Sequence, residues 1–183
     1  MRKWRTSKRS PRGGGVIAEF PAGIFLLFLG FFFPMLGLST WAYRTLFVYY
    51  ATRDACSVAA KSPSHALAVS NADRIWKRDL GTWTEVQEVP GGGAGHQVFI
   101  VERPINQSGT STENVYSARL KSYDTTSNVY LIRFVATTKI APLIGNLEST
   151  GSWLNTKIPG FTAPFTLQTT HEEFVEDPDS LTN

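Results

Sequence analysis

Few side chains of this chain are placed to do covalent or metal chemistry. Its three histidines, His65, His96 and His171, lie far apart, and none has a second ligand at metal-binding spacing, so we expect surface histidines. Cys56 is the only cysteine, which excludes an intrachain disulfide and a cysteine metal cluster. No serine, histidine and acid form a nucleophile motif. The sequence therefore predicts no catalytic residue, no metal, no cofactor and no enzyme.

A glycine-rich segment at residues 91–95 has the composition of a phosphate-binding loop. It lacks the lysine and the serine or threonine of such a loop, and no helical pattern follows it. We interpret it as the flexible loop of a hairpin.

One carboxylate stands out by its position. Glu19 directly precedes an uncharged run from Phe20 to Tyr43, and 24 residues without a charge are typical of a membrane-spanning helix. A carboxylate at the start of such a helix is disfavoured unless something compensates its charge, which marks it as a candidate functional residue. The alternative is that Glu19 lies among the lipid headgroups and only marks the end of the helix.

Basic residues dominate the N-terminus. Six lie within the first twelve residues, with no acid among them, whereas the rest of the chain carries 12 bases and 15 acids. A basic stretch can bind nucleic acid, but one placed directly before an apolar helix is better explained as its cytoplasmic flank. We therefore expect a cytoplasmic N-terminus, export of the chain from about Arg53 onward, and no nucleic-acid partner.

The residues around Glu19 resemble the class III signal of type IV pilins and pseudopilins. Basic residues are followed by Gly14, by four small or apolar residues, by Glu19 and Phe20, and by the apolar run. In that family the prepilin peptidase cuts after the glycine on the cytoplasmic side, and the glutamate becomes the fifth residue of the mature chain. The resemblance implies a cut between Gly14 and Gly15. Cleavage after Gly13 or after Gly15 is the alternative, because three glycines are consecutive.

The pair Glu19-Phe20 is the form found in tight adherence, or Flp-type, pilus systems. Nearly the whole chain is similar to the TadE-like family of those systems: an apolar segment with proline, an aromatic helix that carries Arg44, a patch of small residues, and a late proline-rich segment before a final strand. The resemblance implies a minor pseudopilin that acts in pilus assembly. Its implied partners are the lipid bilayer, the prepilin peptidase, other pilins or pseudopilins, and the assembly platform.

Cleavage at this point would also change the local electrostatics. It removes the six N-terminal bases and creates a free amine at Gly15. That amine and the Glu19 carboxylate could pair, within one chain or between neighbours, and in a low dielectric each charge would compensate the other. Such a pair would make lateral docking of apolar helices selective, where hydrophobicity alone discriminates little.

The apolar pattern predicts the element that positions Glu19. One helix from Val16 to about Ala60 would be roughly 65 Å long, about twice the hydrocarbon thickness, so its second half must leave the bilayer. Pro21 and Pro34 are expected to kink it, with the main bend at Pro34. Cys56 would be half-buried on it. Four aromatic residues suit the membrane interface: Trp41, Tyr43, Tyr49 and Tyr50.

Further along, Ser62 and Pro63 predict the end of this helix and the cap and first turn of another at residues 64–80. Four segments rich in β-branched and aromatic residues then predict strands of a small, mainly antiparallel sheet. They are residues 97–102, 115–121, 128–137 and 165–170. The acidic residues 172–179 are expected to end the fold and remain solvated. The predicted fold class is α+β.

These predictions divide the chain into a basic leader (1–14), a long helix (15–61) and an exported α+β domain (62–183). The leading hypothesis is a TadE-like pseudopilin in the cytoplasmic (inner) membrane, with its C-terminal domain periplasmic or extracellular. The alternative is a permanent membrane-anchored module that is never processed and recruits a partner through that domain. The presence of residues 1–14 in the mature protein distinguishes the two. An ordinary secretory signal fits less well, because the apolar run is too long.

Overall fold

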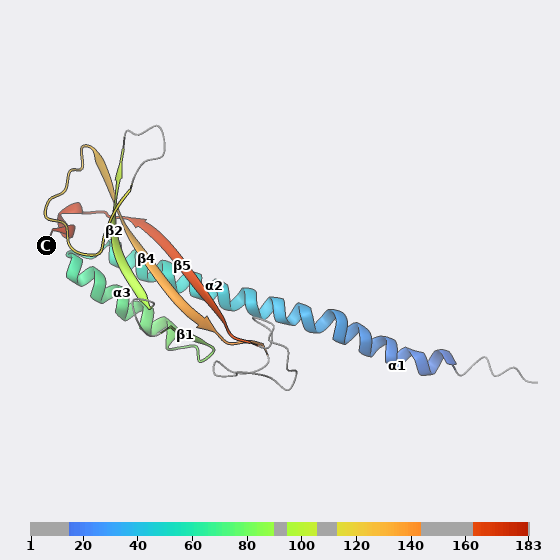
Figure 1. Ribbon diagram of the computed structural model, residues 1–183. Helices are drawn as coiled ribbons and strands as arrows, with labels where there is room; N and C mark the ends of the chain where they lie inside the picture. Colours follow the sequence, from blue (N-terminus) through green and yellow to red (C-terminus); the bar gives the residue numbers. More distant parts are fainter. Residues whose placement is uncertain (1–14, 90–94, 106–112, 144–162, 183) are drawn as a thin grey trace, which may run out of the picture. The chain divides into compact units, whose positions relative to one another are not determined.

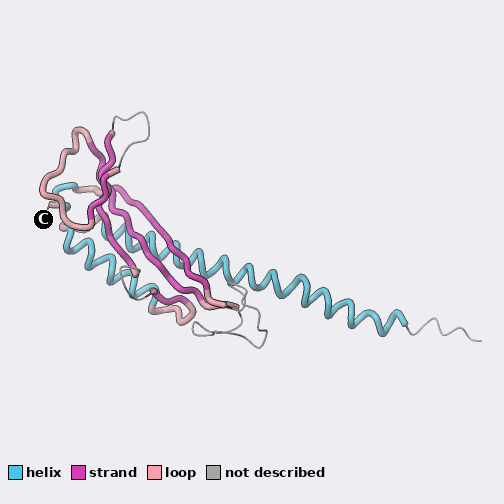
Figure 2. Tube along the Cα trace, in the orientation of Figure 1, coloured by secondary structure: helices cyan, strands magenta, loops and turns pink. Residues whose placement is uncertain are grey.

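The structure is a computed structural model that describes residues 15–89, 95–105, 113–143 and 163–182. It confirms the α+β class, with a long apolar N-terminal helix, a second helix and an antiparallel sheet (Figures 1 and 2). The elements are, in chain order, α1 (Gly15–Leu27), the π-helical turn η1 (Phe28–Phe32), α2 (Phe33–Ala60), α3 (His65–Leu80), β1 (Val86–Glu88), β2 (His96–Pro104), β3 (Asn114–Tyr116), β4 (Asn128–Ile140), β5 (Phe165–Phe174) and the 3-10 turn η2 (Pro178–Leu181). The leader, most of the glycine-rich segment and most of the late proline-rich segment lie outside the described residues.

The chain forms two compact units, Met1–Ser39 and Thr40–Asn183. Their boundary falls inside α2, so this helix belongs to the globular unit from Thr40 onward. The described helical segment from Phe20 to Ala60 is long and apolar enough to cross a membrane, judged by its length and composition. The predicted extent of the long helix, through Ala60, is confirmed.

In the first unit, Pro34 follows a widened turn. Proline lacks an N–H, and its ring collides with the carbonyl four residues earlier, which here belongs to Gly30. Gly30 lies within the π-helical turn, where the N–H of Phe33 donates to the carbonyl of Phe28, five residues back. A π turn is a known way for a helix to absorb such a clash. The helix therefore continues through Pro34 by locally changing its hydrogen-bond pattern.

In the globular unit, β4 is the central strand of an antiparallel sheet. Along one edge it pairs first with β2, from Asn128 to Ala136, and then with β1, from Thr138 to Ile140. Its other edge pairs with β5 over ten residues. Strand β3 extends the sheet beyond β2. The length of β4 follows from its sequence, in which β-branched and aromatic residues run for almost the whole strand.

One face of the sheet holds the core, and both helices pack against it. The even-numbered residues of β4 are buried: Tyr130, Ile132, Phe134, Ala136, Thr138 and Ile140. The ring of Phe134 lies 5.5 Å from that of Trp76 in α3. Helix α3 is amphipathic and buries Ala68, Ala72, Trp76 and Leu80 at helical spacing. Its side chains therefore fix which face of the sheet is covered.

Several predicted boundaries are corrected. The predicted strand 115–121 is formed only at Asn114–Tyr116, and the short strand β1 was not predicted. The second helix is confirmed, but its N-cap is Ser64, whose Oγ accepts from the N–H of Leu67. Ser62 instead donates to the carbonyl of Val58, so Pro63 lies in the turn between the helices.

The prediction that the acidic tail trails off in solvent is wrong. Glu172 and Glu173 belong to β5, which continues to Phe174. Beyond it, Leu181 is buried in the core and its carbonyl accepts from the N–H of Leu120. Val175 also packs against the core, so these two apolar residues hold the end of the chain on the domain while the acidic residues between them, Glu176, Asp177 and Asp179, remain exposed.

Candidate functional site

The predicted site lies at the start of α1. Gly14 is outside the described residues, Gly15 is the first residue of α1, and Glu19 follows one helical turn later. Residues four apart share a face of a helix, so the backbone places Gly15 and Glu19 on the same side. Phe20, whose surface is 69% exposed, comes next. The structure thus brings three of the four predicted site residues onto adjacent turns of one helix.

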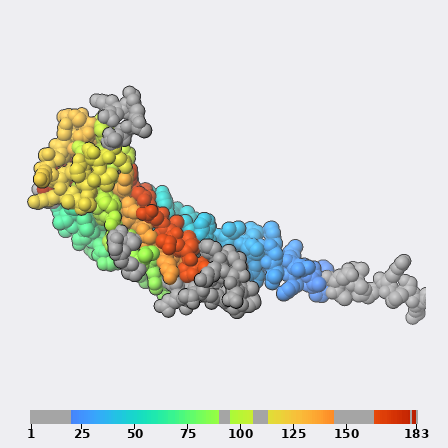
Figure 3. All heavy atoms as spheres, viewed as in Figure 1, coloured from blue at the N-terminus to red at the C-terminus, as the bar shows by residue number. Residues whose placement is uncertain are grey.

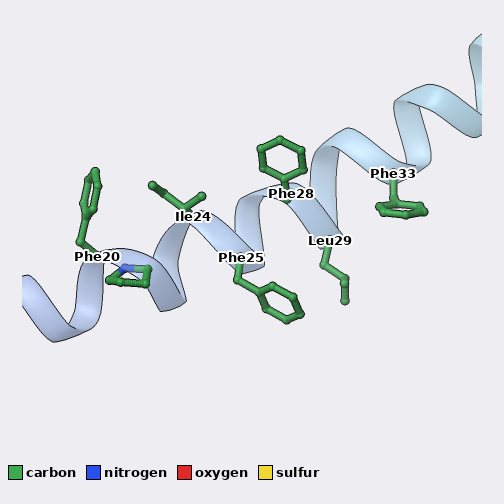
Figure 4. Close-up of a pocket in the computed structure, with 7 residues that line it drawn as sticks. Phe20, Ile24, Phe25, Phe28, Leu29 and Phe33 are labelled. Atoms are coloured by element: carbon green, nitrogen blue, oxygen red, sulfur yellow. The ribbon is translucent and has the colours of Figure 1, made fainter.

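An apolar groove follows the site along the helix. Figure 4 shows Phe20, Ile24 and Phe28 on one side of the ribbon and Phe25 and Leu29 on the other. Each set has a spacing of four, which is the spacing of the side-chain ridges by which one helix packs against another. All side chains that line the groove are apolar. The surface can therefore accept lipid tails or a second apolar helix.

The second half of α2 presents small residues to the sheet. Ala51, Ala55, Cys56 and Ala59 are buried, and their size lets the helix backbone approach the strands closely. Thr52 Oγ1 lies 2.7 Å from Thr169 Oγ1 of β5. The space-filling view shows β5 running alongside this part of the helix (Figure 3). The helix is therefore fastened to β4 and β5 by close packing and by a few short polar contacts.

Cys56 is more buried than predicted. It has no exposed surface, and its Sγ lies 3.3 Å from the carbonyl of Ile132 and 3.4 Å from that of His171. Burial away from water raises the pKa of its thiol to about 12. A thiol with this pKa has little thiolate at neutral pH, so it packs as an apolar side chain and is not a nucleophile.

The prediction of three surface histidines is wrong. The side chain of His96 is only 16% exposed; its Nδ1 lies 2.6 Å from Glu88 Oε1, and its Nε2 lies 3.2 Å from Asp73 Oδ1. His171 contacts the ring of Tyr49, and Nε2 of His65 is buried.

The His96 cluster ties together three elements and does not form a metal site. Asp73 comes from α3, Glu88 from β1 and His96 from β2, while Lys77 pairs with Asp73 at 2.8 Å. Among the described residues, no group of histidine, cysteine and acidic side chains could hold a metal ion. The cluster could not be predicted from local spacing, because its members are brought together only by the tertiary fold.

The opposite face of the sheet carries an ionic ring. Four residues alternate in charge, with nitrogen–oxygen distances of 2.6 to 3.1 Å: Arg103, Glu113, Arg133 and Glu172. Hydrogen bonds from Arg133 and Arg103 hold the pKa of Glu113 below its ordinary value. Each charge in the ring has two opposite neighbours, so the ring holds β2, β4 and β5 together and has little affinity left for a charged ligand.

Outside the ionic ring, the carboxylate of Glu102 is surrounded by neutral hydrogen-bond donors. Its two oxygens accept four hydrogen bonds of 2.8 to 3.2 Å, from Asn114, Tyr116, Asn128 and Tyr130. Burial is the largest influence on the pKa of Glu102 and raises it, but the hydrogen bonds together outweigh burial and leave the pKa lowered. With its lone pairs occupied, this carboxylate links β2, β3 and β4 and is not available as a general base.

No protein-family model, curated protein or solved structure matches this chain. The described polar clusters have their hydrogen-bonding capacity largely filled within the protein. What the described surface offers is an apolar helix that begins near one carboxylate.

Proposed function

We propose that this protein is a minor pseudopilin of the TadE-like type, acting in assembly of a tight adherence pilus or a related secretion apparatus. The observation that carries the proposal is that the two halves of one long helix have different surroundings. Its first half has large apolar side chains exposed from Phe20 onward, and its second half packs one face against the domain. A subunit that must both sit in a membrane and present a folded domain needs both halves.

The charge pattern gives the orientation. The six bases before Gly13 favour a cytoplasmic N-terminus, since basic flanks are retained on that side. The globular unit would then lie in the periplasm or outside the cell, joined to a single span in the cytoplasmic membrane. The protein acts through assembly contacts and not as an enzyme.

The mechanism rests on removal of the leader after Gly14 by the prepilin peptidase. Gly15 then carries a free amine one helical turn from Glu19. Within one chain, the carboxylate is near the positive end of the helix dipole as well as the amine, and both favour its charged form. Between chains, the amine of one subunit compensates the carboxylate of its neighbour, which makes charge pairing depend on correct longitudinal register.

The groove beside Phe20 complements this contact. Its ridges, spaced by four residues, can interdigitate with those of a second apolar helix. In lipid such packing has no large hydrophobic driving force, so a charge pair at one end decides which helices associate and in which register.

Two pairs of variants in the native host test the proposal, with fibre formation and the mass of the mature protein as readouts. Gly14→Val should leave the leader attached, because a β-branched residue obstructs a site that needs a small residue, while the matched Gly13→Val should be processed. Glu19→Val should be processed and inserted yet fail to assemble fibres, while Glu19→Asp should retain partial assembly. Normal fibres from Glu19→Val would refute the proposed role of the carboxylate.

A further inference from the structure

Five aromatic side chains of the globular unit lie around residues 41–47 of α2. They come from α2 itself, from the segment after α3 and from the start of β5. The rings of Trp41 and Phe165 lie 6.0 Å apart, and Trp83 lies 5.3 Å from Tyr43 and 4.6 Å from Phe47. Phe165 opens β5, and Trp83 follows the end of α3. We call these five residues the aromatic collar. Two of its members are well exposed, Trp41 at 44% and Tyr43 at 58%.

Chain connectivity fixes where the collar lies along the candidate membrane span. The uncharged run starts at Phe20, and about 20 helical residues cross the hydrocarbon layer, which brings the helix to its far edge near Ser39. Trp41 follows by two residues and Tyr43 by four, so at a rise of about 1.5 Å per residue both fall within the headgroup layer. Phe165, in contact with Trp41, must lie at the same level.

The ionic ring and Glu102 lie at the other end of the strands. On β5, Phe165 is the first residue, whereas Glu172 of the ionic ring lies about 23 Å and Phe174 about 30 Å further along, at the rise of a strand. Glu102, with its four donors, pairs with Tyr130 near the start of β4, also far from the collar. The collar is therefore far from the ionic ring and from Glu102, whereas the His96 cluster lies nearer to it, because Glu88 is level with Leu167 across β4.

We propose that the aromatic collar seats the exported domain in the headgroup layer of the membrane, so that the start of β5 and the turn after α3 touch lipid. Tyrosine and tryptophan favour this layer because each has an apolar ring and a polar edge. The proposal rests on the membrane span of the proposed function. It adds that the domain itself, through Phe165 and Trp83, binds the lipid surface.

Matched tryptophan probes at the two ends of β5 test this. In the full-length protein, Trp4, Trp41, Trp83 and Trp153 are replaced by phenylalanine, and the buried Trp76 is kept to preserve the core. Phe165→Trp and Phe174→Trp are then added separately. Each protein is reconstituted in vesicles of phosphatidylcholine and phosphatidylglycerol, with or without bromine on the acyl carbons nearest the headgroups. A variant that retains Trp41 reports whether the helix is inserted, and one that retains Trp83 samples the collar without a new side chain.

We expect brominated lipid to lower the emission of the Phe165→Trp protein and of the variant that retains Trp83, and to leave that of the Phe174→Trp protein unchanged. Equal responses of the Phe165→Trp and Phe174→Trp proteins, with Trp41 quenched, would overturn the seating of the domain while leaving the membrane span intact. That result would also follow if a second copy or another protein covered the collar. An unquenched Trp41 would instead overturn the membrane span, and the collar proposal with it.

Discussion

The guanidinium of Arg44 donates to two consecutive carbonyls at the end of β4, those of Ala141 at 2.5 Å and Pro142 at 3.1 Å. Arg44 is the only charged residue between Phe20 and Thr52. Its charge is therefore used within the protein, where it binds two carbonyls that follow the last residue of β4. The contact joins residues almost a hundred positions apart and fastens α2 to the sheet.

Replacing Arg44 with methionine should loosen this junction. Hydrogen bonds to charged groups contribute about 1.5–3 kcal/mol, so we expect a loss of that size in the free energy of unfolding. The matched control is Arg53→Met, on an exposed position of the same helix. Urea unfolding of the full-length protein in detergent, followed by tryptophan fluorescence, measures both. Equal stability of the two variants would contradict the role assigned to Arg44.

Cys56 should report the undocking of α2 from the sheet. Because burial raises the pKa of its thiol to about 12, alkylation of the native protein at neutral pH should be negligible until the helix separates from β4 and β5. The control is Cys56→Ala combined with Asp54→Cys, which moves the thiol to an exposed position two residues away. Mass spectrometry of samples treated with iodoacetamide should show fast labelling of the control only.

The free energy of unfolding should depend on pH through Glu102. Its folded pKa lies below the ordinary value of 4.5, so its contribution to stability is present above that pH and is lost as the pH falls through the folded pKa. Glu102→Gln should therefore be less stable than the wild type at pH 7, and its stability should fall less on acidification to pH 3. Unfolding free energies at several pH values measure this. Glu176→Gln, at an exposed position, is the matched control, and its unfolding free energy should depend on pH as that of the wild type does.

The buried Leu181 should be necessary for the stability of the whole domain. Leu181→Ala removes a core side chain, which costs about 2–5 kcal/mol. Phe174→Ala is the control, because it truncates a larger side chain that is 65% exposed, and such changes stay within about 0.5 kcal/mol. Thermal unfolding of both variants would show whether the end of the chain belongs to the fold. A similar melting temperature for the two would contradict this.

Sequence periodicity predicted the elements whose own residues carry the signal. The long helix that ends at Ala60, the amphipathic helix through Trp76 and the β-rich segment of β4 were all found where expected. Their patterns depend on which face of each element is buried, and that is written in the local sequence. The predicted cleavage residues are different, because Gly14 lies outside the described residues and the role of Glu19 remains a prediction.

The features that the sequence did not predict depend on tertiary contacts. His96 is placed between carboxylates of two other elements, and no spacing in the sequence links it to Asp73 or Glu88. Strand β1 has three residues and exists because it pairs with the end of β4. Leu181 is isolated among polar residues, so its burial becomes visible only when the domain that receives it is known. Local patterns do not contain this information.

The mass of the mature protein, purified from its native membrane, tests the central claim most directly. If the protein is a processed pseudopilin, intact-mass spectrometry will find a chain that begins at Gly15, which lacks the six N-terminal bases and places Glu19 fifth. Because the cut creates the amine that compensates Glu19, the proposed assembly mechanism requires it. A mature chain that still contains Met1 to Gly14 would contradict the account and favour a permanent membrane-anchored module.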